Sequence, residues 1–163
     1  MKNLTVRDIM THPVVTVQEN DSLETVVTLM TKHRISSLPV VDDENRVIGI
    51  VGEGDLFLKE RGIPFSMVKA PSLFNQWADP QRLPEIYARA RCNTAGQIMT
   101  REVCCAQAEQ SVGEIAETML RFDLTQMPVL CDGKLCGMVA RADLLRLLLP
   151  SEIIAPLQKA SSN

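Results

Sequence analysis

The sequence predicts an α/β fold in which two β-α-β-β-α repeats pack against each other as one body. The main observation is an internal repeat, because a shift of 89 residues carries Ile9-Met10-Thr11 onto Ile98-Met99-Thr100 and Pro39-Val40 onto Pro128-Val129. The composition adds that 45% of the 163 residues are hydrophobic and only 4% aromatic, which predicts an aliphatic core. Each repeat is too short to bury enough apolar surface alone, so we expect the copies to pack together.

The repeat sets the domain boundaries. We assign residues 1–60 to the first repeat, 61–94 to an inter-repeat linker, 95–149 to the second repeat and 150–163 to a C-terminal helix or tail. A flexible tether would be rich in Gly and Ser, but this linker holds four of the six aromatic residues, Phe65, Phe74, Trp77 and Tyr87. We therefore expect a structured, helical linker that packs on its own repeats or in a dimer interface.

Each repeat begins with a short β-type run, at residues 14–17 and 103–106, followed by an amphipathic helix. The apolar positions of each helix recur at i, i+3, i+4 and i+7, as expected for one buried face. They are Leu23, Val26, Val27 and Met30 in the first repeat, and Val112, Ile115, Ala116 and Met119 in the second. Asp21 with Glu24, and Ser111 with Glu114, fit a capping box at the two helix starts.

Two strands joined by a turn follow each helix. In the second repeat the strands are predicted at residues 127–130 and 135–139, with Asp132-Gly133 between them. Asp-Gly between apolar runs is a strong hairpin signal, because Gly readily adopts positive φ. A final helix is expected to begin near Gly52 in the first repeat and near Ala140 in the second.

The charge and hydropathy of the chain exclude several classes of partner. The chain has 17 Lys and Arg against 20 Asp and Glu, a formal net charge of −3, whereas nucleic-acid-binding proteins usually carry a basic excess. No apolar run approaches the ~20 residues that a membrane helix needs, and the first residues lack the apolar segment of a secretory signal. We therefore expect a cytoplasmic protein that binds neither nucleic acid nor membranes.

The five cysteines are Cys92, Cys104, Cys105, Cys131 and Cys136. Their number is odd and no pair has the CxxC spacing, so the pattern does not favour a structural zinc site. In a reducing compartment we expect free thiols that pack as small hydrophobic side chains. Redox sensing is the alternative interpretation.

Short motifs in both repeats resemble the CBS domain, named after cystathionine β-synthase. The first repeat carries Asp8-Ile9-Met10-Thr11, then RISSLPVVD at residues 34–42, then Gly49-Ile50-Val51 followed by Asp55-Leu56. The second carries Gln97-Ile98-Met99-Thr100, then Met127-Pro128-Val129, then Gly137-Met138-Val139 followed by Asp143-Leu144. Each motif is weak alone, but the same order found twice is specific.

The resemblance implies a free-standing Bateman module, in which two CBS domains pack with pseudo-two-fold symmetry. It implies a regulatory module, not an enzyme, that binds AMP, ADP, ATP or S-adenosylmethionine in the cleft between the repeats. Binding would transmit a conformational change to a regulated protein of unknown identity, and the module would form a homodimer. The chain shows no pattern typical of a catalytic triad, a glycine-rich phosphate loop or a metal site, so no catalytic residue, required cofactor or metal is expected.

Two alternative functions stay open. One is a ligand-free interaction scaffold with degenerate pockets, which the missing hydroxyl groups described below would favour. The other is a redox-responsive regulator of a partner protein, which would depend on Cys104 or Cys105.

The resemblance also implies two ligand sites, each with an Asp from one repeat and an adenine pocket drawn largely from the other. A carboxylate can accept hydrogen bonds from two ribose hydroxyls at once, although an Asp in the first turn of a helix is also favoured by the helix dipole. One site would join Asp143 to Thr11, Val15, Thr16, Ile35, Ser36 and Ser37. The other would join Asp55 to Thr100, Cys104, Cys105, Leu124, Thr125 and Gln126.

The phosphate end departs from the family pattern. Where family members often carry Ser or Thr, this chain has Gly52, Gly54, Ala140 and Ala142. A phosphate would then rest on helix N–H groups or on cations. The candidate cations are Lys32, His33, Arg34, Arg121 and Arg141, of which we favour Arg34 and Arg141 because a guanidinium group can form a bidentate fork. Glu53 stands where the second repeat has Arg141, so we expect unequal sites, with the site of Asp143 better suited to phosphate.

Overall fold

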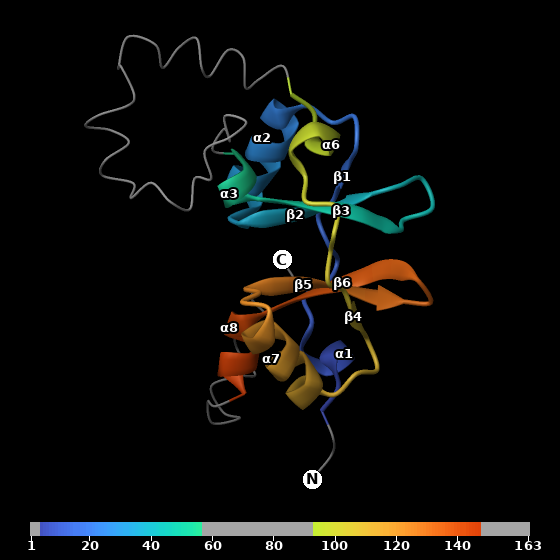
Figure 1. Cartoon of the computed structure of the whole chain (residues 1–163), viewed down its shortest axis with the longest axis vertical. Helices are drawn as coiled ribbons and strands as arrows, with labels where there is room; N and C mark the ends of the chain where they lie inside the picture. The colour runs from blue at the N-terminus through green and yellow to red at the C-terminus, as the bar shows by residue number, and fades with distance from the viewer. Residues whose placement is uncertain (1–3, 57–92, 148–163) are drawn as a thin grey trace, which may run out of the picture. The chain divides into compact units, whose positions relative to one another are not determined.

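The structure is a computed structural model that describes residues 4–56 and 93–147 (Figure 1). The chain divides into two compact units. We call Val15–Asp42 with Ile48–Arg101 the first-repeat unit, and Met1–Val14 with Asp43–Val47 and Glu102–Asn163 the second-repeat unit. The predicted helix of the linker and the predicted C-terminal helix lie outside the described residues.

The first-repeat unit contains a three-stranded sheet in the order β1-β2-β3. Strand β1 (Val17–Gln18) runs parallel to β2 (Ser37–Val41), and α2 (Leu23–His33) connects them. Strand β3 (Val47–Gly52) follows β2 and leads directly into α3 (Glu53–Leu56). Helices α2 and α3 lie on the same face of this sheet (Figure 1).

The second-repeat unit contains an equivalent sheet in the order β4-β5-β6. Strand β4 (Ala106–Gln107) runs parallel to β5 (Gln126–Cys131), and α7 (Val112–Arg121) connects them. Strand β6 (Lys134–Ala140) is antiparallel to β5 and leads into α8 (Arg141–Arg146). Both repeats therefore have the predicted β-α-β-β-α order, and the α/β class is confirmed.

A short helix at the start of each repeat packs in the unit of the other repeat. Helix α1 (Val6–Ile9) belongs to the second-repeat unit, where Val6 is fully buried in the core. Helix α6 (Ala95–Ile98) belongs to the first-repeat unit, where Ala95 is fully buried. Each repeat thus completes the core of the other unit with its first residues, which the sequence analysis did not foresee.

Two glycines make this exchange possible by close approach. A Cβ atom at Gly49 would collide with the Met99 side chain, and one at Gly137 would collide with the Met10 side chain. These positions therefore lack a side chain because the methionine after each exchanged helix lies directly against the strand. Both core clusters are aliphatic, as the composition predicts.

The opening strands begin later than predicted. Strand β1 starts at Val17 and β4 at Ala106, whereas the β-type runs cover residues 14–17 and 103–106. Only the end of each run has a parallel partner, since Val17 lies opposite Val40 and Ala106 opposite Val129. Strand propensity marks extended chain but does not show where pairing begins.

One helix cap is confirmed and the other is wrong by one residue. At α7, the Ser111 hydroxyl accepts from the Glu114 N–H at 3.3 Å, and the Glu114 carboxylate accepts from the Ser111 N–H at 2.9 Å. These hydrogen bonds from Ser111 hold the pKa of Glu114 below its usual value. At α2 the cap is Ser22, while the Asp21 carboxylate accepts from Gln18 N–H at 2.7 Å in the preceding turn.

The β5–β6 hairpin has the predicted two-residue turn, in which Asp132 and Gly133 have φ of 51° and 77°. The register shifts next to Val129, which leaves Cys136 as the extra residue of a β-bulge. Cys136 then forms a disulfide with Cys131, with a Cα–Cα distance of 5.7 Å. The expectation of free thiols is therefore wrong for this pair, because sequence spacing alone does not reveal the bulge.

Candidate functional site

Asp55 and Asp143 occupy equivalent positions, each in the first turn of the helix that follows a hairpin. Asp55 Oδ2 accepts from the Gly52 backbone N–H at 2.9 Å, and Asp143 Oδ2 accepts from the Ala140 N–H at 2.8 Å. These hydrogen bonds orient the carboxylates and satisfy the backbone N–H of the residue before each helix, as the N3 side chain of a capping box does. The capping role and a ligand-binding role are compatible, because each carboxylate has a second oxygen.

The two carboxylates differ in accessibility. Asp143 is only 7% exposed, and its Oδ1 pairs with Arg146 at 3.0 Å, whereas Asp55 is half-buried. Arg146 was missed by the sequence analysis, although its i+3 spacing from Asp143 on a helix could have indicated the pair. A ribose at Asp143 would therefore have to share the carboxylate with Arg146.

The two threonines of the motifs lie beside the strands that lead to these helices. Thr11 exchanges backbone hydrogen bonds with Met138 of β6, at 2.8 and 3.0 Å, in the unit that contains Asp143. Thr100 does the same with Ile50 of β3, at 2.9 and 3.0 Å, in the unit that contains Asp55. Thr11 thus shares a unit with Asp143, and Thr100 with Asp55, the same pairs that were placed together in the two predicted ligand sites.

The segments that precede β2 and β5 lie against the helix starts of their own units. The Glu53 N–H donates to Ser36 O at 2.9 Å, and the Arg141 N–H donates to Thr125 O at 2.9 Å. Gln126 pairs with Ala140 in the sheet. Ser37 is 7% exposed, and its hydroxyl has no hydrogen-bond partner among the described residues.

The remaining pocket candidates line core edges or loops. Val15 and Ile35 pack against the core of the first-repeat unit, and Leu124 packs against that of the second. Thr16 is half-buried in the segment before β1. Apart from Thr11 and Thr100, the residues grouped with each Asp in the sequence belong to the other unit, so those two combinations stay a prediction.

The two neighbouring cysteines differ in environment. Cys104 is exposed, whereas Cys105 is half-buried, and burial raises the pKa of the Cys105 thiol, with a smaller contribution from Cys104. A raised pKa disfavours the reactive thiolate. Neither cysteine is in a disulfide.

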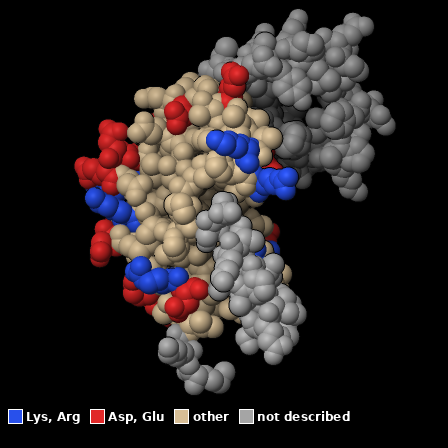
Figure 2. Space-filling model, turned by 180° about the vertical axis from the view of Figure 1, so that it is seen from behind, with Lys and Arg blue, Asp and Glu red and all other residues tan. Residues whose placement is uncertain are grey.

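The two candidate phosphate cations are also in different environments. Arg141 donates to Asp123 Oδ1 at 2.8 Å and to Met119 O at 3.1 Å, so its guanidinium is held within its own unit. Arg34 is exposed and ends α2 with φ of 53°. On the face shown in Figure 2, basic side chains lie near acidic ones and form no broad basic patch.

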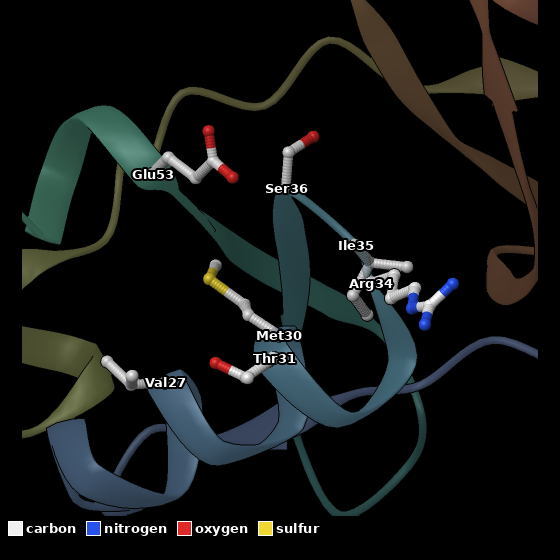
Figure 3. Close-up of a pocket in the computed structure, with 7 residues that line it drawn as sticks. All are labelled: Val27, Met30, Thr31, Arg34, Ile35, Ser36 and Glu53. Atoms are coloured by element: carbon white, nitrogen blue, oxygen red, sulfur yellow. The ribbon is translucent and has the colours of Figure 1, made fainter.

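A pocket of about 450 Å³ lies in the first-repeat unit between the end of α2 and the start of α3. Glu53 and Ser36 lie on one side of it, and the Arg34 guanidinium points away from Glu53 (Figure 3). Of its lining residues, Arg34, Ile35 and Ser36 were predicted as ligand contacts from the sequence, whereas Val27, Met30, Thr31 and Glu53 were not. The sequence predicts Val27 and Met30 as core positions of an amphipathic helix; Met30 is buried, but Val27 is 43% exposed.

Two kinds of feature are absent from the described residues. Within residues 4–56 and 93–147, no group of three His, Cys, Asp or Glu side chains could hold a metal ion. No helix in the same residues is both long and apolar enough to cross a membrane.

Comparison with known proteins identifies relatives over nearly the whole chain. The CBS domain model matches residues 6–61 and 95–150. An uncharacterised protein of Methanocaldococcus jannaschii is 26% identical over 155 residues, covering 88% of this chain and 90% of the relative. The chain also resembles the solved CBS domain of a CBS-domain-containing membrane protein from Sphaerobacter thermophilus, with a TM-score of 0.70, 38% identity, and coverage of 91% and 90%.

A further solved structure carries ligands. It is the CBS domain pair of protein MJ0100 in complex with 5′-methylthioadenosine and S-adenosyl-L-methionine. The similarity has a TM-score of 0.64 at 25% identity and covers 89% of this chain and 95% of that one.

Proposed function

We propose, from the premise that the chain belongs to the CBS domain family as a tandem pair, or Bateman module, that it binds an adenosine compound and thereby regulates a partner protein. The candidate ligands are AMP, ADP, ATP and S-adenosylmethionine. In this proposal the ligand favours one conformation of the module, and the partner responds to that conformation.

The observation that carries the proposal is the duplicated carboxylate. Asp55 and Asp143 follow equivalent strands, and Oδ2 of each accepts from the backbone N–H of the last strand residue, Gly52 or Ala140, three residues earlier in the chain. A carboxylate held in a fixed orientation can accept hydrogen bonds from the 2′ and 3′ hydroxyls of ribose. Capping alone would not require Asp at both places, since Glu or Gln also fills this position of a capping box.

The comparisons support the same ligand class. The CBS domain pair of protein MJ0100 is solved in complex with 5′-methylthioadenosine and S-adenosyl-L-methionine, and the similarity covers 95% of that solved chain. Both molecules contain an adenine and a ribose with free 2′ and 3′ hydroxyls. The similarity therefore favours a ligand that presents ribose hydroxyls to the two Asp residues.

Calorimetry of the whole chain with AMP, ADP, ATP and S-adenosylmethionine tests the proposal. Asp55→Asn and Asp143→Asn are the informative variants, because Asn keeps one oxygen for the Gly52 or Ala140 N–H while losing the charged acceptor. A hydrogen bond to a charged group is worth about 1.5–3 kcal/mol, so each variant should weaken its site about tenfold or more. No binding of any of the four compounds by the wild type, or unchanged affinity in both variants, would contradict the proposal.

We also propose that the chain forms a homodimer, on the evidence of apolar side chains that its own fold leaves exposed. In the second-repeat unit, Leu120 is 76% exposed, Phe122 61% and Leu145 63%, and they lie on or next to the adjacent helices α7 and α8. Large apolar side chains grouped in this way often mark protein contacts. Sedimentation should show a dimer that Leu120→Glu dissociates, while Val27→Glu on α2 should leave it intact.

A further inference from the structure

The two repeats build the same backbone frame around the end of the long helix. Ile35 N–H donates to Met30 O at 3.0 Å, and Leu124 N–H donates to Met119 O at 2.9 Å. The residues before them, Arg34 and Asp123, both have positive φ, of 53° and 50°. The backbone therefore has the same local conformation at these positions in both repeats. Differences in the contacts made there come from the side chains.

Within this shared frame the charges of one pair are reversed. The second repeat has Asp123 and Arg141, while the first has Arg34 and Glu53 at the same two positions. The backbone N–H groups of Glu53 and Arg141 make equivalent hydrogen bonds, at 2.9 Å to Ser36 O and to Thr125 O. The exchange is thus a change of side chains at fixed backbone positions and not a shift of the chain.

The reversal changes which side chain occupies the space at the end of the long helix. In the second repeat, Arg141 crosses the space to reach Asp123 Oδ1 at 2.8 Å and Met119 O at 3.1 Å. In the first repeat, Glu53 has no N–H to donate to the carbonyl of Met30, because an ionised carboxylate only accepts. The Arg34 guanidinium points away from Glu53 (Figure 3), and the space remains as the pocket of about 450 Å³.

The pocket lies next to the proposed ribose carboxylate. Asp55 follows Glu53 by two residues in α3, and a Cβ atom placed on Gly52 would lie 3.6 Å from Asp55 Oδ2 and 3.9 Å from Ser36 O. Ser36 and Glu53 both line the pocket. A ribose held by Asp55 can therefore direct its 5′ substituent into this pocket.

We call Asp55 together with this pocket the first-repeat site. We propose that Glu53 makes this site selective for adenosine ligands whose 5′ substituent carries an ammonium group, against ligands whose 5′ substituent carries a phosphate. This inference rests on the proposed adenosine binding. The Glu53 carboxylate would accept hydrogen bonds from an amino-acid ammonium group and repel a phosphate. Val27 and Met30 provide apolar contact for a short methylene and thioether chain, and the hydroxyls of Thr31 and Ser36 lie beside it.

Three probes that share adenosine separate the possibilities. S-Adenosylhomocysteine and 5′-methylthioadenosine have the same 5′ thioether and differ by the amino-acid group, while AMP has a phosphate there. For the whole wild-type chain, calorimetry should show S-adenosylhomocysteine binding about tenfold more tightly than 5′-methylthioadenosine, as expected for one charged hydrogen-bonded contact. AMP should be the weakest of the three at the first-repeat site.

The variant Glu53→Gln removes the charge and keeps the size. It should reduce the preference for S-adenosylhomocysteine over 5′-methylthioadenosine to about threefold or less. Glu24→Gln, an exposed carboxylate at the other end of α2, is the matched control and should leave the preference unchanged. The double variant Arg34→Asp/Glu53→Arg installs the pair of the second repeat, so it should fill the pocket and abolish the preference.

The possible outcomes distinguish a wrong role for Glu53 from a wrong proposal of adenosine binding. Equal wild-type affinity for S-adenosylhomocysteine and 5′-methylthioadenosine, or an unchanged preference in Glu53→Gln, would overturn the role of Glu53 while leaving adenosine binding intact. Absence of binding by all three probes would instead refute the proposed function, and the inference with it.

Discussion

The dual role of Asp143 can be tested by comparing two substitutions without any ligand. Asp143→Ala removes the acceptor of the Ala140 N–H and the partner of Arg146. Asp143→Asn keeps an acceptor oxygen at nearly the same place. If the carboxylate caps α8, the two variants should differ in stability.

The structure sets the expected magnitudes. Loss of a capping side chain costs about 0.5–2 kcal/mol. The ion pair adds at most about 1 kcal/mol, because the Arg146 side chain is 46% exposed and its charge is screened by solvent. Asp143→Ala should therefore destabilise the protein by about 1–3 kcal/mol, and Asp143→Asn by about 1 kcal/mol or less.

Urea denaturation measures this difference. The midpoint should fall clearly for Asp143→Ala and only slightly for Asp143→Asn, with unchanged slopes. Equal losses for both variants would show that the charge and not the cap stabilises α8. No loss for Asp143→Ala would refute the structural role altogether.

Three further outcomes follow from local features. Hydrogen bonds from Ser111 lower the pKa of Glu114 in the folded state. The stability that they contribute is therefore present above the normal Glu pKa of 4.5 and is lost as the pH falls through the pKa of the folded state, and acid unfolding curves of Glu114→Gln should lack this loss of stability. Gly49→Val should destabilise the fold by about 1–3 kcal/mol in thermal melts, since its side chain would collide with Met99, and unchanged stability would refute the close approach. Reduction of Cys131–Cys136 should add two hydrogen masses and change stability little, because hairpin hydrogen bonds already close this short loop; global unfolding on reduction would contradict this.

Local patterns in the sequence were enough to predict the order of elements. The i, i+3, i+4, i+7 spacing located α2 and α7, and Asp132-Gly133 located the hairpin turn, because both depend on neighbours within a few residues. The equivalence of Asp55 and Asp143 also followed from the repeat. Their hydrogen bonds to the preceding strand end then appear in the structure at equivalent places.

Features that depend on distant residues could not be predicted in this way. Helices α1 and α6 are four residues long, too short for a periodic pattern. Each packs into a hydrophobic core that is formed mainly by the other repeat. The bulge that brings Cys136 to Cys131 depends on strand register. The pocket at Glu53 depends on how side chains from two elements meet at the end of α2. In the second repeat Arg141 reaches Met119 O and Asp123 at this place, whereas in the first repeat Glu53 lines a pocket.

Native mass spectrometry of the whole chain with AMP, ADP, ATP and S-adenosylmethionine tests the binding of adenosine compounds most directly. We expect an adduct of the mass of at least one of these ligands on the wild type, and its loss in the double variant Asp55→Asn/Asp143→Asn. A wild-type spectrum without an adduct of any of the four compounds at millimolar concentration, or an adduct that persists in the double variant, would contradict this expectation.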